Sequence, residues 1–123
     1  LIDIASVVGK TQKQLKEELG DSTCEKENVS GIGNITTCTY DKGSFQLEVS
    51  FIDKKADWVS VEGLREELAF SPSALQAIGI KQSYGYSESP IGYFWKDMFG
   101  YHEISVFAAR DRVNYIYVKA VTD

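Results

Sequence analysis

The two cysteines are the first residues in this sequence whose type and spacing could do chemistry. Cys24 and Cys38 are the only cysteines of the chain, and they flank the polar, glycine-containing stretch EKENVSGIGNITT. Their spacing excludes the C-x-x-C pattern of redox and zinc sites. We predict a disulfide that closes this loop and stabilises the domain by roughly 3 kcal/mol in the chain-entropy estimate; the alternative is two unpaired, buried thiols. A disulfide would indicate an extracytoplasmic compartment.

Other residues that often carry chemistry do not form a catalytic pattern. The stretch VVGKT (7–11) resembles the end of a phosphate-binding loop, but that motif requires Gly where this chain has Ile4. His102 is the sole histidine and has no Cys, His or Asp at metal-ligand spacing, so we expect a structural position, facing inward or at a strand end. Three aspartates fall in predicted hairpin turns, where Asp bonds its local backbone: Asp53, Asp57 and Asp111. We therefore predict no enzyme, no metal site and no cofactor.

The composition bounds the class of protein and its partners. Apolar residues make up 43% of the 123 residues, which is enough for one folded domain. The net charge of −5 gives no general attraction to nucleic acid or to anionic lipid. No apolar run approaches the 18 or so residues of a membrane span. A protein is therefore the kind of partner that the sequence favours.

Two short helices are expected. In 11–20, Thr11 is a candidate N-cap with Gln14 three residues on, and Gly20 ends the helix. In 71–79, Ser71 is the candidate cap, Pro72 takes the first helical position and Gly79 ends the segment. The segments 2–8 and 63–69 could each add a helical turn before these helices.

Six runs rich in β-branched and aromatic residues are predicted strands: TTCTY (36–40), SFQLEVSFI (44–52), DWVSV (57–61), IGYFWKD (91–97), YHEISVF (101–107) and VNYIYVKAV (113–121). The stretches EVSFIDKKADWVSV (48–61) and EISVFAARDRVNYIYV (103–118) look alike, each within a half that begins with a helix. We therefore predict an α+β fold in which a helix followed by a three-stranded antiparallel meander occurs twice, in 1–62 and 63–123. The two sheets would join into one compact domain with the helices on one face, because one half alone would bury too little surface.

Alternation along these strands predicts an aromatic surface. If the aliphatic residues face the helices, Trp58, Tyr115, Tyr117 and Phe107 lie on the opposite face. Tyr40 and Trp95 could join them, but 91–97 has aromatic residues at both parities and cannot be oriented. An exposed aromatic sheet face is typical of a protein-docking surface, because Tyr and Trp offer a large contact area at little entropic cost. The alternative is that these residues simply suit strands.

The order of these features resembles a known family. A helix led by Gly-Lys-Thr (9–11), a cysteine-bounded loop (24–38), Tyr-x-x-Gly (40–43) and the strand DWVSV (57–61) look like half of a β-lactamase-inhibitory-protein-like module. The whole chain resembles the tandem form, and related helix-plus-three-strand units occur in small bacterial envelope lipoproteins. The resemblance implies a secreted or envelope-anchored, non-enzymatic protein that grips a partner with Trp58, Tyr115, Tyr117 and the hairpin at 40–44. The second half has no cysteine pair, since Tyr93 aligns with Cys38.

We therefore expect a non-catalytic protein-binding module, with inhibition of an enzyme as one form of that role. Its place would be secreted or in the cell envelope, with a lipid anchor in the precursor as one arrangement. Two alternatives stay open. The chain could be a structural domain of a lipoprotein with no binding surface of its own. It could also be a small enzyme or small-ligand carrier that uses His102 or the loop 81–93.

Overall fold

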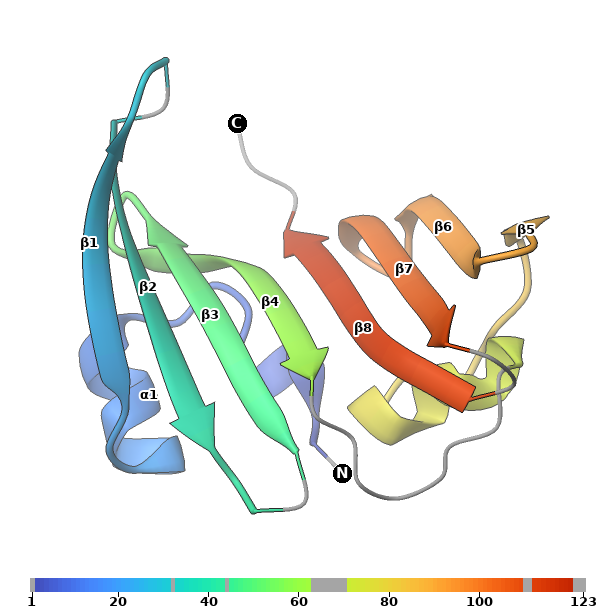
Figure 1. The fold of residues 1–123 in the computed structure, drawn as a ribbon, viewed down its shortest axis with the longest axis horizontal. Helices are drawn as coiled ribbons and strands as arrows, with labels where there is room; N and C mark the ends of the chain where they lie inside the picture. Colours follow the sequence, from blue (N-terminus) through green and yellow to red (C-terminus); the bar gives the residue numbers. More distant parts are fainter. Residues whose placement is uncertain (1, 32, 44, 63–70, 110–111, 121–123) are drawn as a thin grey trace.

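The protein forms a single eight-stranded antiparallel sheet (Figure 1). The computed structural model describes residues 2–31, 33–43, 45–62, 71–109 and 112–120. The strand order is β1-β2-β3-β4-β8-β7-β6-β5, so the last strand in the sequence lies in the middle of the sheet, next to β4. The strands are β1 (Thr23–Val29), β2 (Gly33–Asp41), β3 (Gln46–Ile52), β4 (Lys55–Glu62), β5 (Ser87–Ser89), β6 (Gly92–Met98), β7 (Tyr101–Ala109) and β8 (Arg112–Ala120).

The predicted repeat of a helix followed by a three-stranded meander is wrong. The described chain forms one continuous sheet, and two of its strands were not expected: β1, in the stretch predicted to be a loop, and β5. The side chains of β1 are exposed except for half-buried Val29, so this strand lacks the alternation of apolar and polar residues that marks a half-buried strand. β5 has only three residues. The boundary proposed between residues 62 and 63, and the helical turn predicted at 63–69, fall at or within a segment outside the described residues.

The first helix has the predicted cap, and the second has a different form. In α1 (Gln12–Leu19), the Thr11 hydroxyl accepts a hydrogen bond from the Gln14 amide at 3.2 Å. The Gln14 side chain in turn accepts from the Thr11 amide at 2.9 Å, which confirms the capping box. The second is a 3₁₀ helix, η2 (Pro72–Ile78), which ends at left-handed Gly79 as predicted. Its expected cap, Ser71, contacts the Ser73 hydroxyl instead of an amide. A 3₁₀ turn, η1 (Ile4–Ser6), occupies the segment predicted at 2–8.

The core lies between the sheet and the helices. α1 contributes Leu15, and η2 contributes Leu75 and Ile78. Both helices lie behind the sheet in Figure 1, and their buried side chains belong to one cluster with inward residues of the sheet. That cluster includes alternate residues of the central strands: Leu47, Val49, Phe51, Val59, Val61, Ile104, Val106, Ile116 and Val118. The alternation predicted for β3 and β4 is therefore confirmed, and the other parity forms the opposite face, which we call the open face.

A disulfide joins Cys24 to Cys38, as predicted. The two residues are direct partners across β1 and β2, and Cys38 is fully buried whereas Cys24 is exposed. Because β1 contributes no fully buried side chain, packing alone holds it weakly. The disulfide therefore fixes the edge strand to the core through Cys38.

Removing this disulfide should destabilise the fold. We expect the double variant Cys24→Ser with Cys38→Ser to lose about 2–3 kcal/mol in the free energy of unfolding, because the cross-link no longer restricts the unfolded chain. Urea denaturation measures this loss. Amide exchange should accelerate most in β1 and much less in β3. Equal urea midpoints for the variant and the wild type would contradict the stabilising role.

Candidate functional site

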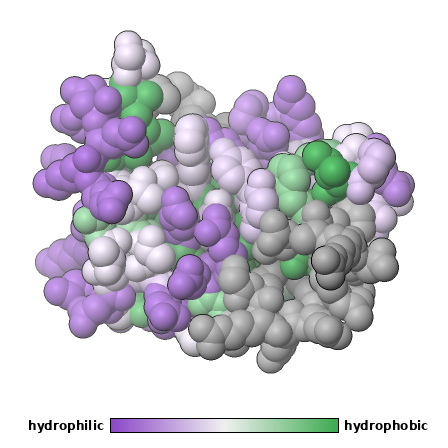
Figure 2. All heavy atoms as spheres, viewed as in Figure 1, coloured by the Kyte–Doolittle hydropathy of each residue, from purple (hydrophilic) through white to green (hydrophobic). Residues whose placement is uncertain are grey.

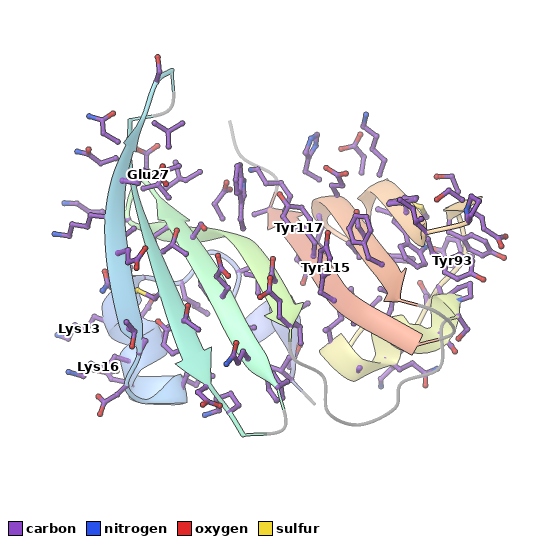
Figure 3. The ribbon with its side chains drawn as sticks, in the orientation of Figure 1. Lys13, Lys16, Glu27, Tyr93, Tyr115 and Tyr117 are labelled. Carbon is purple, nitrogen blue, oxygen red and sulfur yellow. A yellow bond between two sulfur atoms is a disulfide. The ribbon has the colours of Figure 1, made fainter. Side chains whose placement is uncertain are left out.

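Five aromatic side chains gather on the open face: Trp58 from β4, Phe94 from β6, Phe107 from β7, and Tyr115 and Tyr117 from β8. We call this set the aromatic patch. Each of the five is partly exposed. Strand pairing places Phe94 opposite Ser105 and Ser105 opposite Tyr117, so neighbouring strands bring the rings to the same region of the sheet. Figure 3 shows Tyr115 and Tyr117 together on β8, on the side away from the helices.

The rings of the patch contact one another in two groups. Phe107 stacks on Tyr115 with a centroid separation of 4.5 Å, and Phe94 meets the other side of Phe107 edge-on at 5.5 Å. Trp58 and Tyr117 form the second group, with centroids 6.4 Å apart across the seam between β4 and β8. Ser105 lies among these rings and is only 2% exposed. The patch is therefore a preformed, largely apolar surface.

An ion pair lies beside Trp58. The Lys119 ammonium donates to the Asp57 carboxylate at 2.6 Å and lies 5.9 Å from the Trp58 ring centroid. Asp57 is the extra residue of a β-bulge, because Trp58 pairs with Ser50 while Ala56 pairs with Phe51. The predicted turn position for Asp57 is therefore wrong; the turn itself is at Asp53 and Lys54. The bulge directs the Asp57 side chain to β8, where it joins the two halves of the sheet.

Carboxylates give the open face a negative electrostatic character. Glu48 pairs with Ser60, and Ser60 pairs with Tyr117, so Glu48 lies two strands from Tyr117 and one strand from Trp58. Burial and the nearby Glu48 carboxylate raise the pKa of Glu62. Burial, followed by the charges of Glu103 and Asp57, likewise raises the pKa of Tyr117. Both shifts indicate that a further negative charge on this face is unfavourable.

The raised pKa of Glu62 predicts a pH-dependent stability difference. Glu62 ionises in the unfolded chain near its ordinary pKa of 4.5 and at a higher pH in the folded protein, so stability falls as the pH rises through this interval. We therefore expect Glu62→Gln to melt at the same temperature as the wild type near pH 3 and at a higher temperature near pH 7. Calorimetry at both pH values tests this, with exposed Glu27→Gln in β1 as the control. A variant that melts lower than the wild type at pH 7 would contradict it.

The structure brings four of the six predicted contact residues together. Trp58, Phe107, Tyr115 and Tyr117 all belong to the aromatic patch. Tyr40 and Trp95 are each 1% exposed and lie in the core on the other face, so neither contributes to this surface.

Phe94 belongs to the patch but was not predicted from the sequence. The stretch from Tyr93 to Trp95 carries an aromatic residue at every position, so alternation alone could not orient it. The register decides: Phe94 pairs with open-face Ser105, while Trp95 pairs with core residue Ile104.

The alternative sites proposed from the sequence have different surroundings. His102 is exposed and is the second residue of β7, so it takes the expected strand-end position and not the inward one. Its Nδ1 lies 3.2 Å from the Asp97 carboxylate. In the loop 81–93, the Trp95 indole donates to the backbone carbonyls of Ser83 and Tyr84, at 3.3 Å and 3.1 Å. Tyr84 remains 61% exposed. The loop is thus attached to the core while presenting aromatic rings at the edge of the sheet.

A groove of about 600 Å³ lies apart from the patch, between the start of α1 and the turns of two hairpins. It is lined by Thr11, Gln12, Lys13, Gly33, Asn34, Thr36, Phe51, Asp53 and Lys54. Within the described ranges, no three His, Cys, Asp or Glu side chains converge as a metal site requires. None of the helices described in the structure has the length and apolar character needed to cross a membrane.

Comparison with known proteins identifies the fold but not a family. No family model matches the sequence, and no curated protein does either. Among solved structures, a cysteine-rich secretory protein from Staphylococcus aureus is similar, with a TM-score of 0.56 and 12% sequence identity. The match covers 96% of this chain but 46% of that protein, so this chain spans about half its length. The likeness concerns the fold alone. None of the comparisons names a β-lactamase-inhibitory-protein-like module, so that resemblance stays a prediction.

Proposed function

We propose that this chain is a non-catalytic protein-binding module that acts outside the cytoplasm and contacts its partner with the aromatic patch. The proposal is supported by the position of five partly exposed rings on the face opposite both described helices. Two of them, Tyr115 and Tyr117, are labelled in Figure 3. Aromatic residues dominate the energetics of protein interfaces, because a preorganised ring buries a large area while losing little conformational freedom. Inhibition of an enzyme is one form that such binding can take.

The distribution of polarity across the open face supports a bounded contact area. Figure 2 shows hydrophilic residues gathered over β1, at one edge of the sheet. The patch lies on β4 and on β6 to β8. Polar residues of β2 and β3 lie between it and β1, such as Thr37 and Ser50, whose hydroxyls are 3.1 Å apart. An apolar centre with a polar border is the usual anatomy of a protein interface.

The proposed extracytoplasmic location is supported by the disulfide. Disulfides persist in secreted and envelope compartments and are uncommon in the reducing cytosol. The similar staphylococcal protein is itself called secretory, which agrees with this location without establishing it for this chain. A lipid anchor on the precursor belongs to the same proposal.

Loss of the two rings at the seam should weaken partner binding. We expect Trp58→Ala with Tyr117→Ala to reduce affinity about tenfold or more, because a large aromatic side chain at the centre of an interface can contribute about 2 kcal/mol. The partner is first captured from the culture fluid or envelope fraction of the source organism with immobilised wild-type protein. Once it is purified, calorimetric titration measures its affinity for each variant.

A matched control separates the open face from general aromatic adhesion. Tyr84→Ala with Tyr86→Ala also removes two exposed rings, but from the loop at the sheet edge, where Tyr86 packs against Tyr93 and Trp95. This control should bind the partner as the wild type does. If instead the control loses affinity and the Trp58 and Tyr117 variant keeps it, the contact surface is the edge loop and the proposal is wrong.

A further inference from the structure

Two carboxylates border the aromatic patch on the β4 side. Glu48 on β3 and Glu62 on β4 share the open face, since Glu48 pairs with Ser60 and Glu62 lies two residues farther along β4. Side chains in this diagonal relation lie about 7–8 Å apart. Val61 pairs with Ile116, so Glu62 is next to Tyr115 at the end of the β4–β8 ladder. The carboxylates and the rings therefore face one space.

The described part of the chain supplies no cation to these carboxylates. Neither Glu48 nor Glu62 has an ion pair or hydrogen bond among the described residues. Lys119, a basic residue of β8 on this face, bonds Asp57 at the other end of the β4–β8 ladder, where it is opposite Trp58. Among the described residues, the negative charge of Glu48 and Glu62 therefore has no cation that neutralises it.

Two raised pKa values agree with an excess of negative charge on the open face. The pKa of Glu62 is raised by burial and by Glu48, and that of Tyr117 by burial, Glu103 and Asp57. Half-buried carboxylates without a counter-charge raise the energy of the free protein, and a bound cation would lower it.

We propose that the partner presents an arginine side chain to the open face, with its guanidinium between Glu48 and Glu62 and against the rings of Tyr115 and Tyr117. This inference rests on the proposed protein-binding function and names the partner's chemistry. The negative charge of Glu48 and Glu62 favours a cation. The rings favour a planar guanidinium, which stacks on aromatic faces and can bond two carboxylates at once, over the compact, strongly hydrated ammonium of lysine.

A pair of peptides tests the charge requirement directly. The probes are acetyl-Ser-Leu-Arg-Leu-Ser-amide and the same peptide with citrulline, a neutral analogue of nearly the same shape, in place of arginine. In ¹H–¹⁵N spectra, the arginine peptide should shift the amide signals of Ser60, Tyr115 and Tyr117, and bind about fivefold or more tightly than the citrulline peptide. Equal affinity for the two peptides, or shifts confined to residues outside the open face, would overturn the proposal.

Charge-matched variants locate the carboxylates responsible. Glu48→Gln with Glu62→Gln should reduce the affinity for the arginine peptide to that for the citrulline peptide. Glu25→Gln with Glu27→Gln changes the net charge equally, but on the exposed edge strand β1, and should keep the preference for arginine. If both double variants lose the preference to the same extent, net charge alone explains the binding and the site is rejected. Saturable signal shifts at Glu48 and Glu62 with calcium chloride alone, at lower concentration than the peptide needs, would identify a metal site instead and also reject it.

The natural partner separates this inference from the proposed function. If the variant of Trp58 and Tyr117 loses the captured partner while that of Glu48 and Glu62 binds it unchanged, the open face is the interface and the arginine contact is wrong. If both variants lose affinity and the Glu25 and Glu27 control does not, both proposals are supported. Unchanged partner binding by both variants would reject the docking face itself.

Discussion

Replacing Asp57 by Ala is expected to lower the free energy of unfolding by about 3–5 kcal/mol, because it removes one member of a buried ion pair. The Asp57 side chain is 2% exposed and that of Lys119 16% exposed, so water cannot readily replace the lost carboxylate. The pair also links β4 to β8, at the seam where the strands from the two ends of the chain meet. Its loss should therefore weaken the sheet at its centre as well as the local contact.

Urea denaturation measures this effect, and two variants test its cause. Asp57→Ala combined with Lys119→Met replaces the ion pair with apolar groups and should recover most of the lost stability, because no charge is left buried without Asp57. His102→Ala removes the exposed contact with Asp97 and should change stability by less than about 1 kcal/mol. A small loss for Asp57→Ala, similar to that of His102→Ala, would show that solvent reaches the Lys119 ammonium and that the pair is not a stabilising link.

The β-bulge at Asp57 explains why the sequence did not reveal the ion pair between Asp57 and Lys119. Asp57 follows the hairpin turn closely, and Asp near a turn usually bonds its local backbone. The sequence position is compatible with that role, but the extra residue of the bulge points its side chain to Lys119, which lies 62 residues away in the chain. Contacts of this kind depend on the strand order, which local patterns do not contain.

Elements marked by short-range residue patterns were predictable from the sequence. Elements that depend on contacts between distant segments were not. The capping box at Thr11 and the inward parity of Leu47 and Val49 follow from short-range spacing, and both are confirmed. The edge strand β1 was missed because its only fully buried attachment is the disulfide through Cys38, which creates no apolar period in β1 itself. The sequence predicted two three-stranded sheets that join, but it did not identify the pairing of β4 with β8 that joins them, because that pairing links distant segments.

The candidate site shows the same division. Alternation in isolated strands identified Trp58, Tyr115, Tyr117 and Phe107, because each has aliphatic neighbours that enter the core. It could not show that Phe107 stacks on Tyr115, since that contact depends on the pairing of β7 with β8. Glu48 was visible only as a polar position of its strand, and Glu62 lies just beyond the predicted strand 57–61. The register makes them a pair, which is the basis of the arginine proposal.

Trp95 provides the sharpest contrast with the aromatic patch, because it is the chain's other tryptophan and lies on the opposite face. Its side chain is 1% exposed and lies in the core, and its indole N–H donates hydrogen bonds to the backbone carbonyls of Ser83 and Tyr84. Replacing Trp95 by Ala should cost about 3–5 kcal/mol, the range for removing a large buried aromatic side chain. Trp95→Phe keeps most of the ring and should lose less, mainly through the missing hydrogen bonds to the loop 81–93.

The two tryptophans should therefore give opposite results when stability and partner affinity are measured on the same samples. Trp95→Ala should have a much lower urea midpoint, yet the fraction that remains folded should bind the captured partner with nearly wild-type affinity. Trp58→Ala should show the smaller loss of stability, since its ring is half-buried beside the Lys119 ammonium and does not fill the core. It should also lose affinity about tenfold. If the Trp95 variant lost affinity while folded and the Trp58 variant did not, the partner would bind on the helix side or the edge loop. The open face would then be a structural surface, in which the rings serve only to shield the seam between β4 and β8.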